Sequence, residues 1–295
     1  MKRRHRVTEL VLSSGGTNGV AMLGALESLR LQGRLRRINR IVGTSIGAVI
    51  GLLLTIGYSP RTLFELVLRI DFAQFDDMDC DSVLMFYDTL GAVDGRSILR
   101  LIRIMMEKRG LAEGTTFAEL PRAIEYVATG YSVSELRTVA FSAATHPTMP
   151  VLLAVRISIS IPLLFRPVRF DNQVFVDGGW SEPTPVRFCR RRRRALIVSL
   201  SSGVYHSDAP KATYPMEMPE YLSRLILDVG KLLRTRCWTR MQRRFPDNLV
   251  VVQLRANTGK QMSFLDLEMS RETKLDLYSQ GVAAATENGR RTSSG

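Results

Sequence analysis

The sequence predicts an α/β fold around a mainly parallel sheet, and two observations support this prediction. The N-terminal part has the pattern of a βαβ unit: strand, glycine-rich loop, helix and second strand. The strands of such a unit pair in parallel through a right-handed crossover. Further strand-like stretches alternate with helical ones along the chain. The 295 residues are 45% hydrophobic, enough for a substantial core, and contain neither an internal repeat nor a long linker, so we expect one domain over residues 1–295.

Hydrophobic spacing predicts the first elements. Thr8–Leu12 has the β-branched and aliphatic composition of a short buried strand. Val20–Leu31 repeats apolar residues at helical intervals and is followed by Gly33, a residue typical of helix ends. Ser13–Gly19 is the turn-rich loop between them. Ile41–Gly57 begins as an apolar strand, passes through a glycine-flanked turn and continues as an apolar helix.

The later elements follow from the same reasoning. Ser59 and Pro60 have the roles of N-cap and first-turn residue for a helix that reaches Ile70. Thr116 and Glu119 have the spacing of a capping box before a short helix. Further helices are expected over Ser97–Lys108, Met149–Ser160, Glu217–Arg244 and Ser270–Glu287, and strands over Ile124–Thr129, Arg137–Ser142, Val168–Phe170, Val174–Val176, Ala195–Leu200 and Leu249–Leu254. Residues 195–288 therefore add C-terminal strands and helices, and residues 289–295 are expected to form a polar tail.

Composition and charge narrow the function classes. The net charge of +13 and the pI of about 10.2 favour partners with negative surfaces, either anionic lipid or nucleic acid. The three cysteines, Cys80, Cys189 and Cys237, are widely spaced, which predicts reduced thiols in a cytosol-like compartment and no metal site. The basic N-terminus is not followed by an apolar core long enough for a signal peptide, so we do not expect secretion.

Charged segments are candidates for binding a membrane or a metal ion. Arg190–Arg194 and the basic face near Arg234–Arg244 are expected to recruit the protein to anionic membranes, although Arg190–Arg194 also fits a solvated helix end or a nuclear signal. Asp71–Asp81 is acidic but lacks the register of a calcium loop, so we expect a solvated loop or a lid.

The most informative motif is Gly43-Thr44-Ser45-Ile46-Gly47, a G-x-S-x-G between a strand and a helix. Such a turn holds its serine in a strained conformation with the hydroxyl projecting from the backbone. The following helix directs its positive N-terminal end at the Ser45 oxygen, where negative charge would develop. The same apolar stretch has glycines at four-residue intervals and nearly the length of a membrane span, but its polar residues argue against that alternative.

The loop before the first helix has three interpretations: a phosphate site, a simple turn or an oxyanion hole. The G-x-G-x-x-G spacing and the Walker lysine of phosphate loops are missing. Free backbone N–H groups in such a loop can hold the negative oxygen of a tetrahedral intermediate. The candidate oxyanion residues are Gly15, Gly16, Thr17, Asn18 and Gly19.

A nucleophilic Ser45 needs a base. His146 and His206 lie downstream, but neither follows a recognisable strand-end motif. Asp177 ends an apolar strand and precedes two glycines that allow the backbone to approach another element closely. A carboxylate in this place could accept the Ser45 proton directly and form a Ser/Asp dyad, while a plain turn at Asp177 is the alternative.

In order and spacing, these motifs resemble those of the patatin-like phospholipases. The resemblance rests on Ser14-Gly15-Gly16-Thr17-Asn18-Gly19, Gly43-Thr44-Ser45-Ile46-Gly47, Asp177-Gly178-Gly179 and Arg156-Ile157-Ser158-Ile159-Ser160-Ile161-Pro162, the last similar to the family segment R-A-S-x-A-x-P. It spans residues 7–185, the motif core of the chain. The resemblance implies a three-layer α/β/α sandwich and hydrolysis of lipid acyl esters by a Ser45–Asp177 dyad, without a metal or another cofactor.

Two positions depart from the family loop, G-G-G-x-R/K-G. Ser14 replaces the first glycine, which restricts the backbone, and Asn18 replaces the basic residue, which removes a possible anchor for the loop or a substrate phosphate. Gly15, Gly16 and Gly19 are retained, so the oxyanion donors are expected to survive.

Together these observations predict a phospholipase A-type lipid acyl hydrolase, cytoplasmic and peripherally bound to anionic membranes. Asp177 would deprotonate Ser45, and the N–H groups of Gly15 and Gly16, with that of Ile46 as a further candidate, would hold the oxyanion. Two alternatives stay open: a non-catalytic basic protein that binds membrane or nucleic acid, and a serine esterase that uses His206. Nucleic acid is the less favoured partner.

Overall fold

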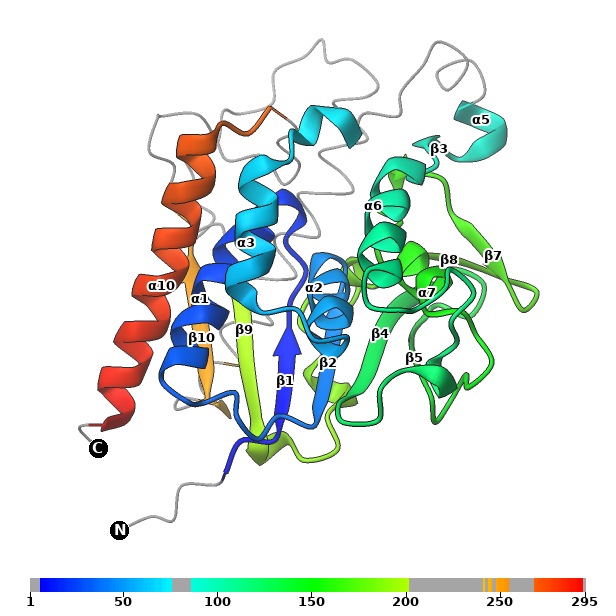
Figure 1. The fold of residues 1–295 in the computed structure, drawn as a ribbon. Helices are drawn as coiled ribbons and strands as arrows, with labels where there is room; N and C mark the ends of the chain where they lie inside the picture. The colour runs from blue at the N-terminus through cyan, green and yellow to red at the C-terminus, as the bar shows by residue number, and fades with distance from the viewer. Residues whose placement is uncertain are drawn as a thin grey trace, which may run out of the picture.

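The computed structural model describes residues 6–75, 86–201, 248–254 and 268–293, together with Met241, Arg244 and Phe245. In these residues, an eight-stranded sheet has the order β10-β9-β1-β2-β4-β8-β7, and β5 pairs with β4 beside this path (Figure 1). The strands are β1 (Glu9–Leu12), β2 (Arg40–Thr44), β4 (Glu125–Ser132), β5 (Arg137–Ser142), β7 (Val168–Phe170), β8 (Gln173–Asp177), β9 (Ala195–Ser201) and β10 (Leu249–Gln253). β10, β9, β1, β2 and β4 are parallel, whereas β5, β7 and β8 join antiparallel. The predicted α/β class with a mainly parallel sheet is confirmed.

The helices are α1 (Gly19–Leu31), α2 (Ile46–Thr55), α3 (Pro60–Arg69), α5 (Phe86–Thr89), α6 (Arg96–Glu107), α7 (Val151–Ser158) and α10 (Arg271–Ser293). In Figure 1, α10, α1 and α3 lie together beside β10 and β9, and α2 and α7 lie along β2 and β4. Two short strands, β3 (Gly91–Val93) and β6 (Leu163–Phe165), form a separate parallel pair.

The central strands bury side chains on both faces. Leu10 and Leu12 of β1 join the large apolar cluster beneath the helices, whereas Val11 belongs to a second cluster with Ile197 of β9 and Phe245. Successive side chains of a strand point to opposite faces, so the two clusters lie on opposite sides of the sheet. Burial on both faces is typical of parallel sheets and agrees with the layered sandwich that the family resemblance implies.

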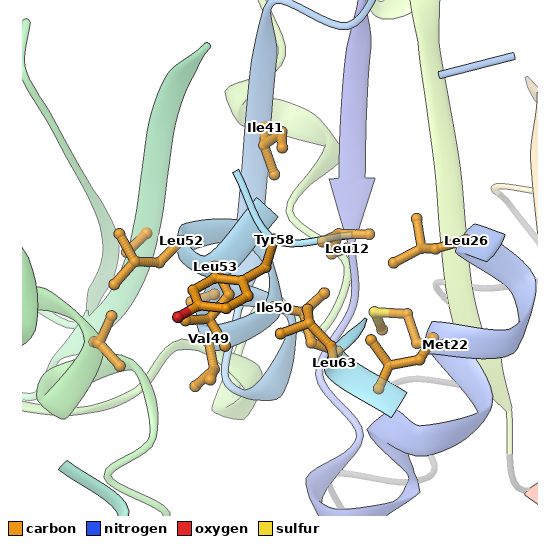
Figure 2. Packing of buried hydrophobic residues seen from close by; sticks show 14 of the residues in the cluster. Leu12, Met22, Leu26, Ile41, Val49, Ile50, Leu52, Leu53, Tyr58 and Leu63 are labelled. Carbon is orange, nitrogen blue, oxygen red and sulfur yellow. The ribbon is translucent and has the colours of Figure 1, made fainter. Parts of the chain in front are cut away.

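Helix α2 is surrounded by the large cluster. Figure 2 shows its side chains Val49, Ile50 and Leu53 among Leu12 of β1 and Leu63 of α3. This environment explains why the helix is apolar all round. It has 10 residues, half of the roughly 20 that a bilayer span requires, and it directly follows a strand. The membrane-span alternative for this stretch is therefore wrong, and no helix in the described part of the chain combines the length and apolarity of a transmembrane segment.

Helix α10 extends beyond its predicted end. It continues past Glu287 to Ser293, so the polar tail predicted from residue 289 is wrong over residues 289–293. The physical reason is tertiary: the Asn288 side chain is buried, donates to the Leu249 carbonyl of β10 at 3.0 Å and accepts from Arg34 at 2.7 Å. These contacts hold a polar segment in helical form.

Other predicted elements agree with the structure within a few residues. Ser59 caps α3 by accepting from the Thr62 N–H at 3.0 Å, and Thr116 and Glu119 form the capping box. The β7–β8 hairpin turns through Asp171 and Asn172, both with positive φ. The expected helix Glu217–Arg244 lies outside the described residues except for Met241 and Arg244, and so do His206, Cys80, Cys237 and most of Asp71–Asp81.

Candidate active site

Ser45 occupies the sharp turn between β2 and α2. Its backbone has φ 57° and ψ −127°, and its side chain is buried. A positive φ at a residue other than glycine is strained, as the geometry of a nucleophile elbow requires. The flanking positions admit only glycine, because a Cβ on Gly43 would lie 2.3 Å from the Gly47 carbonyl oxygen and a Cβ on Gly47 2.5 Å from the Leu12 carbonyl oxygen. The predicted strand, turn and helix are confirmed.

Strand β4 brings the ends of β2 and β8 together. Thr44, the last residue of β2, pairs with Thr129 of β4, and Asp177, the last residue of β8, pairs with Gly130. These two β4 residues are consecutive, and consecutive Cα atoms lie about 3.8 Å apart. Because β2 runs parallel and β8 antiparallel to β4, their C-terminal ends meet against the same strand. Ser45 and Asp177 therefore enter one small region of the molecule.

Asp177 is held through its backbone and its carboxylate. Its N–H donates to the Ser160 carbonyl at 2.8 Å, and its Oδ1 accepts from the Gly179 N–H at 2.6 Å. The side chain is buried. The hydrogen bond from Gly179 fixes the orientation of the carboxylate within the turn that follows β8, Gly178–Trp180.

The glycine-rich loop after β1 lies beside the elbow at Ser45 and beside the turn that follows Asp177. Since β1 pairs with β2 through Leu12 and Gly43, the loop after β1 is the neighbour of the elbow. A Cβ on Gly19 would lie 2.4 Å from Ile46 Cγ1, and a Cβ on Gly179 would lie 3.0 Å from Ser14 Cβ. The glycine-rich loop thus contacts both the elbow and the turn that follows Asp177.

Within this loop, Gly16–Asn18 forms a single 3-10 turn before α1 begins at Gly19. Gly16 has φ 58°, a conformation that favours glycine. The Asn18 N–H donates to the Gly15 carbonyl at 3.2 Å and closes the turn, so this N–H is engaged within the protein. Asn18, one of the departures from the family pattern, is buried. Gly15 and Gly16 stay the preferred oxyanion candidates of this loop.

Two contacts at the site come from residues for which the sequence predicted no role. The Ser45 N–H donates to Ser158 Oγ at 2.9 Å, and the Thr44 and Thr129 hydroxyls lie 2.6 Å apart. Thr129 belongs to no motif. Ser158 belongs to Arg156–Pro162, the segment that resembles the family pattern R-A-S-x-A-x-P, and this resemblance is the sequence signal that could have indicated a role for it.

His146 gains no geometric support as the base. His146 follows β5, which pairs with the edge of β4 away from β2, and its ring packs edge-on against Phe141 with centroids 5.0 Å apart. Burial lowers the pKa of His146. His206 lies outside the described residues. Cys189 is buried, and burial raises its pKa to about 12, so it does not act as a thiolate nucleophile. Among the residues that the structure describes, no group of three or more His, Cys, Asp or Glu could hold a metal ion.

The arginine run is far from Ser45. Arg190–Arg194 precedes β9, which is parallel to β1 and β2, whereas Ser45 follows the C-terminal end of β2; the two therefore lie at opposite edges of the sheet (Figure 1). The N–H groups of Arg190 and Arg191 donate to Glu9 at 3.0 and 2.6 Å, and the Arg190 guanidinium contacts Glu125 at 2.9 Å. The first residues of the run are thus bonded to the rest of the fold, whereas the side chains of residues 191–193 are exposed.

Known proteins are similar to this chain in sequence. The family model described as patatin-like phospholipase matches residues 10–189, which include the glycine loop, the elbow and Asp177. A protein named "Probable lipid hydrolase 463L" from Invertebrate iridescent virus 6 is 29% identical over 180 residues, 58% of this chain and 59% of that protein. The uncharacterized protein R571 of Acanthamoeba polyphaga mimivirus is 24% identical over 274 residues, 89% of this chain and 88% of that protein.

Solved structures share the fold. VipD from Legionella pneumophila has a TM-score of 0.59 and 14% identity, covering 96% of this chain and 67% of that chain. ExoU from Pseudomonas aeruginosa, in complex with SpcU, has a TM-score of 0.55 and 21% identity, covering 98% of this chain and 53% of that chain. The chain thus spans 59% of the iridescent virus relative and about half of ExoU.

Proposed function

Because the chain belongs to the patatin-like phospholipase family, we propose that it hydrolyses carboxylic esters of phospholipids with Ser45 as nucleophile and Asp177 as general base. The observation that carries the proposal is the meeting of β2 and β8 on β4, where Thr129 and Gly130 pair with Thr44 and Asp177. This arrangement brings a strained, glycine-flanked serine and a buried carboxylate to the same place. Their chemistry fits a Ser/Asp dyad without histidine.

In the proposed reaction, Asp177 takes the hydroxyl proton while Ser45 Oγ attacks the ester carbonyl carbon. The tetrahedral intermediate collapses, and the lysolipid leaves with the proton that Asp177 returns. The acyl group is now bound to Ser45. Asp177 then deprotonates a water molecule, which attacks the acyl carbonyl, and release of the fatty acid restores the Ser45 hydroxyl.

Backbone groups would stabilise the negative oxygen that forms in each half of the reaction. The N–H groups of Gly15 and Gly16, supported by that of Ile46, are the proposed oxyanion donors. Helices α1 and α2 begin immediately after the glycine loop and the elbow, with 13 and 10 residues. The positive N-terminal ends of both helices therefore face the region where the negative charge develops, which favours the anionic intermediate.

The fixed carboxylate supports the role of Asp177. One oxygen, Oδ1, is held by the Gly179 N–H at 2.6 Å, and the backbone N–H is bound by Ser160. A group held at both points loses little freedom when it reaches the reactive geometry. In our proposal the other oxygen, Oδ2, faces Ser45 Oγ and takes the proton.

We also propose that the substrate is reached at an anionic membrane, with the protein peripheral and on the cytoplasmic side. The support is the net charge of +13, which attracts a basic protein to such a surface. The arginine run lies at the edge opposite Ser45, so long-range attraction and productive contact with lipid would involve different surfaces.

The deciding experiment maps the nucleophile. The protein is incubated with a fluorophosphonate probe, digested and analysed by mass spectrometry, and hydrolysis of phosphatidylcholine–phosphatidylglycerol vesicles is followed in excess EDTA. We expect the label on Ser45, with hydrolysis in the wild type and none in Ser45→Ala, which should keep its melting temperature because a single hydroxyl is removed. A label on another residue, or wild-type turnover in Ser45→Ala, would refute the elbow. Salt-sensitive vesicle binding without hydrolysis would favour the non-catalytic alternative.

A further inference from the structure

We infer that Ser158 is a positioning residue, which holds the backbone of Ser45 in its reactive conformation; this inference rests on the proposed function. The Ser45 N–H donates to Ser158 Oγ at 2.9 Å across a separation of 113 residues. Both residues are buried, with exposed fractions of 2% for Ser45 and 0% for Ser158. The contact joins the elbow to the C-terminal end of α7.

The elbow needs such a partner for a geometric reason. β2 ends at Thr44, the last residue that pairs with β4, so the next N–H lies beyond the ladder of the sheet. A buried N–H without an acceptor is unfavourable, and the strained φ of 57° persists only if surrounding contacts enforce it. The Ser158 hydroxyl supplies the acceptor and thereby ties the strained residue to a helix.

The end of α7 is itself fixed. The buried Arg156 donates from Nε to the Asp94 carbonyl at 2.8 Å, from Nη2 to the Arg166 carbonyl at 2.7 Å and from Nη1 to Ser160 Oγ at 2.5 Å. Burial lowers the pKa of Arg156 to about 10, so the guanidinium stays charged at neutral pH and the anchor is cationic. Ser158 is thus attached to a segment that cannot easily shift.

The same segment also holds the acid. The main-chain carbonyl of Ser160 accepts from the Asp177 N–H at 2.8 Å. One turn of chain therefore contacts the backbone of Ser45 through Ser158 and the backbone of Asp177 through Ser160. This connection fixes the two proposed catalytic residues relative to each other. Since Ser158 contacts the main chain of the elbow, its loss should slow the chemical step and leave ester binding nearly unchanged.

The test compares two buried serines. Ser158→Ala removes the acceptor for the Ser45 N–H, whereas Ser142→Ala removes a hydroxyl of equal size from another buried serine, whose Oγ lies 3.1 Å from Thr145 Oγ1 in the region of β5. On a soluble short-chain ester, we expect Ser158→Ala to lower kcat at least tenfold with KM changed less than twofold. Ser142→Ala should keep kcat within about threefold, because its hydroxyl contacts neither Ser45 nor the end of α7 in the structure. Both rates are normalised to the folded fraction from thermal unfolding.

A second measurement reads the contact directly. In protein labelled with ¹⁵N-serine, the Ser45 amide signal is assigned by its loss in Ser45→Ala. Its hydrogen exchange should accelerate in Ser158→Ala and stay unchanged in Ser142→Ala. Equal kcat in the two variants, or unchanged exchange in Ser158→Ala, would overturn the inference while an active wild type keeps the proposed function. A wild type that hydrolyses no ester and takes no fluorophosphonate label would overturn both.

Discussion

The backbone conformation of Ser45 depends on three parts of the fold: the turn between β2 and α2, strand β4 and helix α7. Its φ of 57° follows from the turn between β2 and α2, Thr129 anchors the preceding residue from β4, and Ser158 binds its N–H from α7. None of these partners is adjacent to it in sequence. The reactive conformation is therefore a property of the assembled core around a short, local motif.

At the level of single residues, Asp177→Asn tests the proposed base. The amide keeps the size of the side chain and an oxygen that can accept from the Gly179 N–H, but it cannot take a proton from Ser45. We expect kcat for a soluble ester to fall by about 10²- to 10⁴-fold, the range typical of a lost general base, with the melting temperature little changed. Steady-state kinetics and thermal unfolding provide the two measurements.

Histidine variants are the control. His146→Ala and His206→Ala should each retain most of the activity, because neither residue takes part in the proposed dyad. An inactive His206→Ala together with an active Asp177→Asn would show that the protein is a histidine-dependent esterase instead.

At the level of elements, the site is formed where elements end. The loops after β1 and β2 lie side by side because these strands are parallel neighbours, and β8 contributes its own C-terminal end because it runs antiparallel to β4. Helices α1 and α2 begin at the same edge. Polar groups thus gather where strand ends and helix N-termini meet. The apolar side chains of α2, which follows the elbow, pack into the large apolar cluster and hold this helix in place (Figure 2).

Two alanine substitutions in α2 test how closely the elbow and glycine loop must approach. A Cβ on Gly47 would lie 2.5 Å from the Leu12 carbonyl oxygen and 2.6 Å from that of Ser13, and these backbone atoms cannot yield easily. We expect Gly47→Ala to cost about 1–3 kcal/mol of unfolding free energy, the usual effect of overpacking. It should also lower ester turnover strongly, because it displaces the loop from Ser45.

Gly51→Ala is the matched control in the same helix. Its Cβ would lie 3.0 Å from the Ile41 Cγ2 methyl, a side-chain atom that can move by a few tenths of an ångström. The gain in helix propensity of about 1 kcal/mol offsets this contact, so stability and turnover should stay near wild type. Urea unfolding and soluble-ester kinetics compare the pair. Equal effects in the two variants would mean that the approach at Gly47 is not special.

At the scale of the whole molecule, the arginine run and the candidate catalytic residues lie at different edges of the sheet. Arg190 is bound to Glu9 and Glu125, whereas Arg191–Arg193 are exposed at the N-terminal edge of the sheet. Ser45 lies at the C-terminal edge, where β2 ends. A protein attached rigidly through the arginine edge would turn Ser45 away from the lipid. We therefore expect these arginines to attract the protein to anionic vesicles over a distance rather than to form the catalytic contact.

The corresponding variant combines Arg191→Gln, Arg192→Gln and Arg193→Gln and leaves Arg190 in place. Each arginine near an anionic surface contributes about 1 kcal/mol, so binding to phosphatidylglycerol-rich vesicles at low salt should weaken by about 100-fold. Turnover of a soluble ester should stay unchanged. Vesicle co-sedimentation and ester kinetics are measured across a salt series.

Screening supplies the control for this prediction. The difference between variant and wild type should shrink as ionic strength rises and vanish on neutral vesicles. Equal loss of vesicle binding and soluble-ester turnover would mean that the three arginines support the fold. Unchanged vesicle binding at low salt would mean that this edge does not attract the membrane.

The sequence by itself determined most elements and the candidate residues. The strands, the elbow at Ser45, the glycine loop and the strand that ends at Asp177 follow from hydrophobic spacing and from glycines at fixed offsets, because these features act over a few residues. The family resemblance joined the motifs into one predicted site. The prediction was less accurate where a distant contact overrides the local pattern: polar residues 289–293 are helical because Asn288 is hydrogen-bonded to Leu249 of β10 and to Arg34 in the turn after α1.

Only the tertiary structure decided how these parts meet. No local pattern shows that β8 runs antiparallel along β4, or that Asp177 and Thr44 pair with consecutive residues of β4. Likewise, the bond from Ser45 to Ser158 spans 113 residues, and the opposite positions of the arginine run and Ser45 depend on the direction of β9 beside β1. Such relations arise from strand order and helix packing, which bring distant segments together, and a sequence pattern that repeats over two to four residues carries no information about them.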